Sequence, residues 1–265
     1  MQEVIVITGA SAGIGAALAH ELSGQGHRLA LAARRREELE QTAREAGGAL
    51  AVPTDVTRRE EVERLRDRAI AEFGRIDVWI NNAGRGISKP VLQLTDADFD
   101  EMMTVNVKSA LYGMQAVVPY FMERRAGHLI NVSSFLGRVP MASIRSVYSA
   151  AKAALNSLTA NLRTDLAVEY PDIHVSLVMP GLVKTGFAQN ALGSSAAAAA
   201  PAASSARPPA GMMQPQTAEE VADAIARLIA QPEAEIYTNP ASPELVRRYY
   251  ADVGAFEAQI LAQTR

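Results

Sequence analysis

The chain has 265 residues and contains no cysteine. This absence excludes disulfide bonds, a thiolate nucleophile and any zinc site that uses cysteine ligands. The four histidines include no pair spaced four residues apart, the spacing that places two rings on one face of a helix, so a histidine metal site is not expected. We predict no metal ion, and the chemistry must come from other side chains.

The sequence also lacks an excess of charge of either sign. Its 26 lysines and arginines stand against 29 aspartates and glutamates, for a net charge of −3, so nothing favours a nucleic-acid partner. It has no apolar run of 18 residues, and Met1-Gln2-Glu3 leads into an apolar run without a basic, signal-like segment. We therefore expect no membrane association and a cytoplasmic location.

Short runs rich in β-branched residues recur along the chain, separated by amphipathic stretches. Several are apolar nearly throughout, as expected of parallel strands that are covered on both faces. The pattern predicts an α/β fold of Rossmann type, a doubly wound seven-stranded parallel sheet with helices on both faces, in one domain spanning residues 1–265. The expected strands are residues 3–8, 28–33, 49–52, 76–80, 128–132, 173–179 and 235–238. Functional residues should follow the strands, because such sheets bind ligands at the carboxyl ends.

Residues 191–211 break this pattern. They contain ten alanines, four serines, three prolines and two glycines, with little apolar bulk to hold a fixed position. Two interpretations stay open: a flexible surface insertion, or a lid over the site, because the segment follows a strand that should end near it. The alanine run could also form a helix.

A glycine-rich turn follows the first expected strand, in Thr8-Gly9-Ala10-Ser11-Ala12-Gly13-Ile14-Gly15. Gly9 allows the tight turn, Gly13 lets the backbone approach a pyrophosphate, and Gly15 lets the following helix pack on the strand. Free amide groups and the positive end of that helix favour an anion. The turn predicts a dinucleotide cofactor, with contacts expected from Gly9, Ser11, Gly13, Ile14 and Gly15.

The second expected strand ends without the acidic residue that usually binds the adenosine ribose of NAD. Arg34-Arg35-Arg36 follows it instead. A guanidinium group can hold a 2′-phosphate, so NADP(H) is favoured over NAD(H), with Arg34 as the first candidate and Arg35 as the second. The alternative is a solvated helix start in which the arginines pair with nearby glutamates.

Tyr148 and Lys152 lie four residues apart in an expected helix, so both side chains share one face. A phenol titrates near 10, but a neighbouring ammonium group stabilises phenolate and lowers that pKa. The pair follows the expected strand 128–132 and the hydroxyl groups of Ser133 and Ser134. The sequence therefore predicts an acid–base pair at the carboxyl edge of the sheet.

Taken in order, these motifs resemble those of the short-chain dehydrogenase/reductase family, and the resemblance covers residues 3 to about 190. The matching landmarks are Thr8-Gly9-x-x-x-Gly13-Ile14-Gly15, Asp55, Asn81-Asn82-Ala83-Gly84, Asn106, Ser134, Tyr148-x-x-x-Lys152, Pro180-Gly181 and Thr185.

The resemblance implies four catalytic residues. Tyr148 would protonate the carbonyl oxygen as hydride arrives from the nicotinamide, or deprotonate the alcohol in reverse. Ser134 would hydrogen-bond that oxygen. Lys152 would bind the nicotinamide ribose and lower the phenol pKa, and Asn106 would hold a water in a proton relay.

Some assignments leave alternatives. Asp55 would contact the adenine amino group, or only cap a helix. Ser133 competes with Ser134 for one role, and Thr185 would contact the nicotinamide carboxamide or a phosphate, or cap a helix. The expected cofactor-binding set is Gly9, Ser11, Gly13, Ile14, Gly15, Arg34, Arg35, Asp55, Val56, Asn82, Ala83, Gly84, Tyr148, Lys152, Pro180, Gly181, Val183 and Thr185.

Within the motif after the fourth strand, Asn82 is expected to support the sheet. Asn81, Ala83 and Gly84 are expected to line the cofactor cleft. The apolar residues expected around the reacting carbonyl are Phe135, Leu136, Val139, Met141, Ile144, Leu182 and Phe187, which suggests a hydrophobic substrate.

We predict an oxidoreductase that transfers hydride between NADP(H) and a ketone, aldehyde or secondary alcohol, with reduction favoured. The alternative is an NADP(H)-binding sensor or scaffold without catalysis. Arg85, Arg138 or Arg145 could anchor a substrate carboxylate, although most such arginines simply face solvent.

The family commonly forms dimers and tetramers through two long helices, here expected at residues 98–124 and 145–169. The resemblance therefore implies a homodimer or homotetramer. Small residues at 150, 151, 153 and 154 would allow close helix approach, between subunits or within one. The aromatic residues of the tail, at 249, 250 and 256, are expected to pack in the core, with an interface as the second possibility.

Overall fold

The computed structural model describes residues 2–187, 190–193 and 213–263. The segment predicted as an insertion or lid lies outside the described residues from position 194 to its end, so that prediction stays untested.

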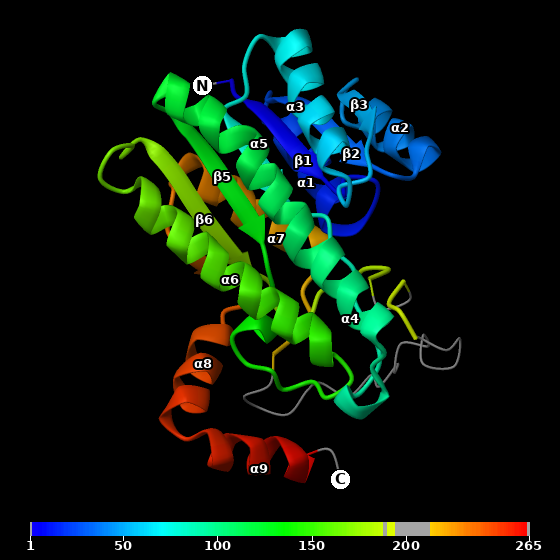
Figure 1. Cartoon of the computed structure of the whole chain (residues 1–265), viewed down its shortest axis with the longest axis vertical. Helices are drawn as coiled ribbons and strands as arrows, with labels where there is room; N and C mark the ends of the chain where they lie inside the picture. The colour runs from blue at the N-terminus through cyan, green and yellow to red at the C-terminus, as the bar shows by residue number, and fades with distance from the viewer. Residues whose placement is uncertain (1, 188–189, 194–212, 264–265) are drawn as a thin grey trace.

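A seven-stranded, entirely parallel sheet forms the centre of the molecule (Figure 1), in the order β3-β2-β1-β4-β5-β6-β7. The winding reverses between β1 and β4, which places a switch point beside the glycine-rich turn. The predicted fold class is confirmed, and the strand ends differ from the predicted ones by two residues or fewer. The strands are β1 (Val4–Thr8), β2 (Arg28–Ala33), β3 (Leu50–Pro53), β4 (Val78–Asn81), β5 (Gly127–Val132), β6 (Ile173–Met179) and β7 (Glu235–Tyr237).

Helices cover both faces of the sheet (Figure 1). The α-helices are α1 (Gly13–Gly24), α2 (Arg36–Glu45), α3 (Arg59–Phe73), α4 (Asp96–Met103), α5 (Ser109–Arg124), α6 (Ser146–Leu166), α7 (Ala218–Ala230), α8 (Ser242–Ala251) and α9 (Val253–Gln263). Short 3-10 helices, η1 (Val91–Gln93) and η3 (Phe135–Gly137), follow β4 and β5.

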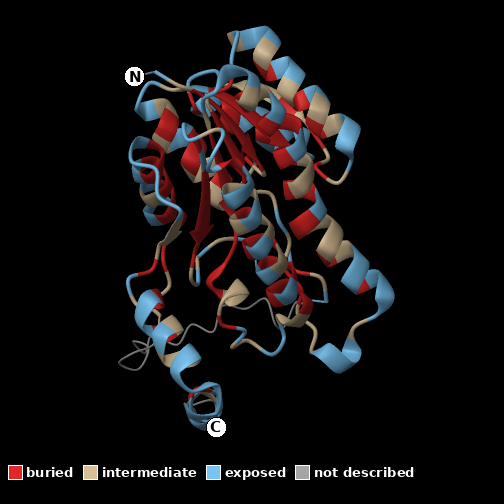
Figure 2. Cartoon of the chain, turned by 60° about the vertical axis from the view of Figure 1, so that its left-hand side comes forward, coloured by how far each residue is buried: buried red, intermediate tan, exposed pale blue. Residues whose placement is uncertain are grey.

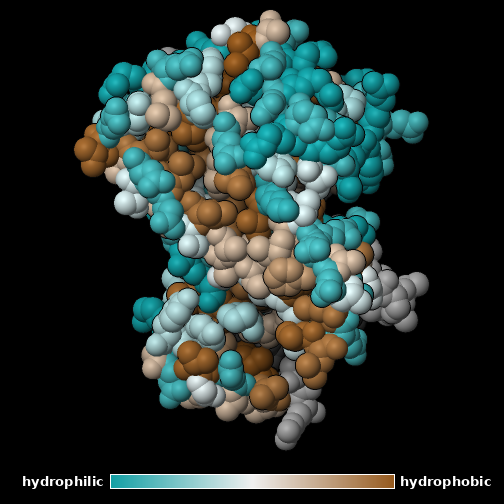
Figure 3. Space-filling model, in the orientation of Figure 1, coloured by the Kyte–Doolittle hydropathy of each residue, from teal (hydrophilic) through white to brown (hydrophobic). Residues whose placement is uncertain are grey.

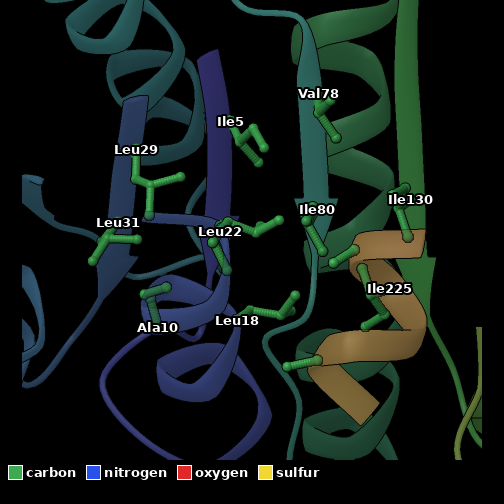
Figure 4. Close-up of a cluster of buried hydrophobic side chains, with 14 of the residues drawn as sticks. Ile5, Ala10, Leu18, Leu22, Leu29, Leu31, Val78, Ile80, Ile130 and Ile225 are labelled. Atoms are coloured by element: carbon green, nitrogen blue, oxygen red, sulfur yellow. The ribbon is translucent and has the colours of Figure 1, made fainter. Parts of the chain in front are cut away.

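Two apolar layers sandwich the sheet because successive strand residues point to opposite faces. On β1, Ile5 and Ile7 pack with Leu18 and Leu22 of α1 and with α7, the cluster shown in Figure 4. Val6, between them, points to the other layer with α3, α5 and α6. Figure 2 shows the strands buried almost throughout, and each fully buried aliphatic side chain contributes about 1.5–3 kcal/mol.

The long helical stretch expected at residues 98–124 is interrupted. Between α4 and α5 the backbone forms a π-helical turn, η2 (Thr104–Lys108), in which the Ser109 N–H donates to the Thr104 carbonyl five residues back. Such turns often occur at functional sites, and this one contains Asn106.

The C-terminal helices α8 and α9 lie beyond the carboxyl ends of the strands (Figure 1). Leu245 of α8 and Phe256 of α9 are buried against Phe135 and Val139. The Tyr249 ring contacts Phe256 with ring centroids 5.6 Å apart. The prediction of core packing for the aromatic residues of the tail is therefore confirmed for Tyr249 and Phe256. It is wrong for Tyr250, whose side chain is exposed.

His128, on β5, is buried at the end of the sheet opposite the cleft. Its Nε2 lies 2.8 Å from the Ser176 hydroxyl, and its Nδ1 has no hydrogen-bond partner within the described ranges. Burial, with a smaller contribution from nearby His174, lowers the pKa of His128 to about 3. The imidazole is therefore neutral in the folded protein at pH 7.

We predict that this buried imidazole makes the fold sensitive to acid. An unfolded histidine titrates near 6.5, so the stability contribution is complete above that pH and is lost as pH falls toward 3. Between pH 7 and pH 4 the loss should reach roughly 3 kcal/mol of unfolding free energy. Urea titrations across this range should show a shallower decline for His128→Gln than for the parent, and an unchanged decline for the exposed control His20→Gln. Equal slopes in all three proteins would contradict the prediction.

Candidate active site

A cleft of about 920 Å³ opens at the carboxyl edge of the sheet. Every predicted cofactor or catalytic residue lines it except Gly15 and Asn106, which lie directly behind lining residues. The fold thus brings together side chains from positions 9 to 185, as the motif order predicts. Their roles remain predictions.

The turn between β1 and α1 is closed by contacts that only glycine permits. Gly9 has φ +70°, in the left-handed region. A Cβ atom at Gly15 would lie 2.3 Å from the Gly9 carbonyl oxygen and 2.7 Å from the Asn82 amide nitrogen. Gly15 therefore lets α1 pack closely on the turn, as the sequence analysis predicted for this glycine.

The N-terminus of α1 fits an anion. Its capping residue, Ala12, offers no side-chain hydrogen bond, and the first turn contains no acidic residue. Ala12, Gly13 and Ile14 all line the cleft, so backbone amide groups at the positive end of the helix face it. A cofactor pyrophosphate suits this place, because it would satisfy donors that the chain's side chains leave uncapped.

Two arginines stand at the far end of the cleft. Arg34 is exposed and forms no ion pair with the described residues, while its charge contributes to lowering the pKa of Asp55. Arg35 donates to the Ser11 hydroxyl at 3.2 Å and pairs with Glu38 at 3.3 Å. The alternative of a helix start with paired arginines therefore fits Arg35 but not Arg34.

Asp55 also lines the cleft, and it does not cap a helix, because α3 begins at Arg59 with Arg58 as its capping residue. Its Oδ1 accepts bonds from the backbone N–H and the hydroxyl of Thr57, at 3.0 and 2.7 Å. Burial alone would raise the pKa of Asp55, but these bonds and the charges of Arg34 and Arg58 bring it below its usual value. The carboxylate is therefore ionised and able to accept from an amino group.

The two asparagines at the end of β4, Asn81 and Asn82, agree only in part with the prediction. Asn82 supports the sheet as expected, donating to the carbonyls of Thr8 at 2.9 Å and Gly9 at 3.3 Å, and it also lines the cleft. Asn81 was expected to line the cleft, and this is wrong. Its amide is buried and donates to Asn131 and to the Ala110 carbonyl, on the side of the sheet that α5 covers.

The structure separates the two serines after β5. The Ser133 hydroxyl donates to the Asn156 side chain and the Lys152 carbonyl, which fixes it to α6. The Ser134 hydroxyl accepts from the Leu136 N–H at 3.2 Å and interacts with the Tyr148 phenol. Ser134 is thus the serine that faces the phenol.

Tyr148 is buried at the cleft wall, with its ring edge-on to Phe187 at a centroid distance of 5.5 Å. Burial raises the pKa of Tyr148 to about 12, although the hydrogen bond with Ser134 and the charge of Arg145 act in the opposite direction. In the free protein the phenol is therefore protonated at neutral pH.

Lys152 shares the cleft but does not lower the phenol pKa as predicted. Its Nζ donates to the Val132 carbonyl at 3.0 Å and lies 5.9 Å from the centre of the Tyr148 ring. Burial lowers the pKa of Lys152 to about 8, so the ammonium group is still mostly protonated at pH 7. The pKa of the phenol lies above its usual value, not below it as predicted, because burial outweighs the hydrogen bond with Ser134 and the charge of Arg145, the cation that favours phenolate.

Asn106 lies behind the cleft and clamps the loop after β4. Its Nδ2 donates to the carbonyls of Arg85 and Met102, at 2.9 and 3.1 Å, and its Oδ1 accepts from the Arg85 N–H at 3.1 Å. The side-chain amide is thus committed to the protein backbone. If Asn106 holds a water molecule, as the resemblance implies, that water must bind the second lone pair of Oδ1 or the backbone of the π-helical turn.

The segment after β6 forms the opposite wall. The Pro180 carbonyl accepts from the Phe135 N–H at 2.8 Å, and the Thr185 hydroxyl accepts from the Phe187 N–H at 3.3 Å. No helix begins at Thr185, so the helix-cap alternative is wrong. Gly13 and Thr185 both line the cleft and lie close together, since a Cβ at Gly13 would lie 3.4 Å from the threonine methyl group.

The inner end of the cleft is largely apolar. Of the seven residues expected around a substrate, Val139 is instead in the core and Ile144 is half exposed outside the lining. The five that line it are Phe135, Leu136, Met141, Leu182 and Phe187. The sequence analysis missed a wall of the cleft that α8 and α9 form. Its only signal in the sequence was the helix-like spacing of the aromatic residues in the tail. The lining residues of this wall are Leu245, Arg248, Phe256, Gln259 and Ile260.

Two classes of feature do not occur in the part of the chain that is described. Within residues 2–187, 190–193 and 213–263, acidic and histidine side chains form no cluster able to hold a metal ion. The helices in those ranges are too short or too polar to span a bilayer.

Known proteins resemble this chain along most of its length. The family model described as short chain dehydrogenase matches residues 3–194. An uncharacterized oxidoreductase of Staphylococcus aureus strain MW2 is 37% identical over 185 residues, covering 69% of this chain and 79% of the relative. One of Staphylococcus saprophyticus is 38% identical over 185 residues, or 69% of this chain and 75% of the relative.

Solved structures share the fold. A short chain dehydrogenase/reductase from Burkholderia phymatum in complex with NAD has a TM-score of 0.83 at 26% identity, covering 96% of this chain and 95% of that one. The closed form of a serine dehydrogenase complexed with NADP+ has a TM-score of 0.80 at 29% identity, covering 90% of this chain and 95% of that one. Both forms of the cofactor thus occur among the neighbours.

We predict that Gly15→Ala disrupts the turn. The new methyl group would collide with backbone, at the Gly9 carbonyl, so the turn must open; we expect a loss of about 1–3 kcal/mol in stability and at least tenfold weaker dinucleotide binding. Gly24→Ala in the same helix meets no atom within 4 Å and should leave both unchanged or slightly improve stability. Thermal unfolding and fluorescence titration with NADPH measure the two effects. Equal behaviour of the two variants would refute the packing argument.

Proposed function

The chain belongs to the short-chain dehydrogenase/reductase family, and on that premise we propose that it transfers hydride between NADP(H) and a carbonyl or secondary alcohol, with reduction of a ketone or aldehyde favoured. The observation that carries the proposal is the meeting of Ser134, Tyr148 and Lys152 in one cleft, beside a helix N-terminus left free for a phosphate. A non-catalytic sensor would not need a buried phenol facing a hydroxyl group.

The nicotinamide, when bound, would supply the hydride. Tyr148 would give its phenolic proton to the carbonyl oxygen as the carbonyl carbon gains hydride, so that the product is a neutral alcohol. Ser134 would donate to the same oxygen while negative charge develops on it. Lys152, held by the Val132 carbonyl, would bind the ribose hydroxyl groups, and the charge of Arg145 would stabilise the phenolate that remains.

The protonation state of the phenol supports the proposed direction. A tyrosine with a pKa of about 12 is a proton donor at neutral pH, as reduction requires. Oxidation of an alcohol would need the phenolate at the start of the reaction.

Arg34 supports the preference for NADP(H). Its guanidinium lies at the cleft end where the adenosine ribose belongs, without a carboxylate partner in the described ranges, so a 2′-phosphate would gain a charge-assisted bond. The similar solved structures contain NAD in one case and NADP+ in another, so the proposed preference rests on Arg34 alone.

We also propose assembly as a homodimer or homotetramer through α5 and α6. Figure 3 shows apolar and small residues across the middle of the face that these helices form in Figure 1. Ala150 and Ala153 of α6 are exposed, whereas Ala151 packs inside the chain, so small side chains are available for close helix contact.

Tyr148→Phe should abolish turnover and keep cofactor binding. Loss of the acid–base group should lower kcat by about 10²–10⁴-fold, while NADPH affinity stays within about threefold. The assay follows NADPH oxidation at about 340 nm over ketones and aldehydes, with Tyr170→Phe as a matched control outside the cleft. An active Tyr148→Phe enzyme would rule out the assigned role, and a parent that binds NADPH but turns over no carbonyl would favour the sensor.

Arg34→Gln should weaken NADPH binding about tenfold or more and leave NADH binding nearly unchanged, because only the phosphate ester loses a partner. Arg36→Gln is the control, since Arg36 is equally cationic and exposed but lies outside the cleft, near Glu40 at 3.7 Å. Calorimetric titration of both cofactors against the three proteins gives the ratios. Parent affinities that are equal for NADPH and NADH would exclude the preference.

A further inference from the structure

The lining of the cleft is strongly cationic. Among the described residues one carboxylate, Asp55, lines it, near Arg34 and Arg35. The cationic side chains of the lining are Arg34, Arg35, Arg85, Arg145, Lys152 and Arg248. Phosphates of the cofactor would neutralise the end near Arg34 and Arg35, but cations also stand at the inner, apolar end, where a substrate must bind.

The three arginines that the sequence places near the mouth have different partners. Arg85 forms an ion pair with Glu101 and also donates to the Asn190 carbonyl. Arg138 pairs with Glu235 and does not line the cleft. Arg145 forms no ion pair with any described residue. The structure therefore distinguishes them, as the sequence could not.

Arg145 is fixed in place beside the reacting group. It lies at the start of α6, three residues before Tyr148, and its Nη1 donates to the Ile87 carbonyl at 2.8 Å. The same nitrogen lies 3.1 Å from where a Cβ at Gly86 would be. Its charge acts on the Tyr148 phenol, so the guanidinium and the phenol belong to one site.

A purely structural role does not account for this arginine. The bond to Ile87 is the one hydrogen bond of its side chain within the described ranges, and a guanidinium has five N–H donors. Half-burying a cation beside the Phe187 ring is costly without a counter-charge. The remaining donors fit the two oxygens of a carboxylate.

We propose that Arg145 binds a carboxylate of the substrate, so that the carbonyl compound reduced here is an oxo acid with an apolar body. This inference rests on the proposed function and adds the substrate class to it. The carboxylate would offset the charge of Arg145, and the apolar part would lie against Phe187, Met141 and the wall formed by α8 and α9.

Arg248 is the rival cation. It lines the cleft from α8, but its guanidinium is held between Gln259, to which it donates, and the Phe256 ring, whose centre is 5.9 Å away. It interacts with no group of the catalytic set. Arg145 is therefore the residue placed to orient the carbonyl toward Tyr148.

The experiment compares charged probes with neutral isosteres. NADP+-saturated protein is titrated calorimetrically with 4-formylbenzoate and 4-formylbenzamide, and with 4-oxopentanoate and 4-oxopentanamide. The parent should bind the carboxylate of at least one pair about tenfold or more tightly than its amide. Arg145→Gln should bring that ratio to near one, Arg145→Lys should restore part of it, and Arg248→Gln should leave most of it.

The outcomes separate this inference from the proposed function. A ratio near one in the parent for both pairs, an unchanged ratio in Arg145→Gln, or loss of the ratio in Arg248→Gln alone would overturn the role of Arg145. NADPH oxidation with the amides would still stand as proof of reductase activity in that case. Equal loss of amide and carboxylate turnover in Arg145→Gln, with a shifted pH profile and an unchanged binding ratio, would assign Arg145 to the phenol instead.

Discussion

Hydrogen bonds of two side chains, Asn82 and Thr8, hold the ends of β1 and β4 together, and the shape of the cleft depends on them. The Asn82 amide donates to the carbonyls of Thr8 and Gly9, and the Thr8 hydroxyl accepts from the N–H groups of Asn82 and Ala83 at 3.0 and 3.1 Å. The glycine-rich turn lies so close to α1 that position 15 has no room for a Cβ atom. Since α1 starts directly after this turn, the same hydrogen bonds position its N-terminal amide groups toward the cleft.

A parallel sheet can gather positive charge at its carboxyl edge, where Asn82 and Thr8 lie. The helix N-terminus and the arginines that follow the strands all contribute positive potential to one cavity, and low-dielectric walls strengthen that field. Within it, position decides what each cation does. Arg34 is exposed and suited to a phosphate, Lys152 is buried on a carbonyl, and Arg145 is half-buried near Phe187 and the phenol. An anionic cofactor and an anionic substrate would share the cavity because its two ends carry separate cations.

Local sequence predicted the frame of this site well, because strand runs, the glycine turn and the Tyr148–Lys152 spacing are properties of short segments. The errors arose where a long-range arrangement decides. Asn81 ends a strand, and the alternation of side chains turns it toward α5 rather than the cleft. The sign of the phenol pKa shift depends on burial, which spacing does not reveal. The wall formed by α8 and α9 packs against Phe135, more than a hundred residues earlier, and no local pattern encodes that contact.

The phenol links these observations, because burial and charge act on it in opposite directions. With a pKa of about 12, forming phenolate at pH 7 costs about 7 kcal/mol, so a reaction that begins with the phenolate starts from a rare species. A reaction that begins with the neutral phenol avoids this cost at the outset and creates the phenolate only as the carbonyl oxygen takes the proton. The cations near Tyr148 then act late, on the charge that the transfer leaves behind. In the proposed reduction the phenol would start in its neutral form, and a carboxylate bound to Arg145 would offset part of the positive charge that acts on the phenolate.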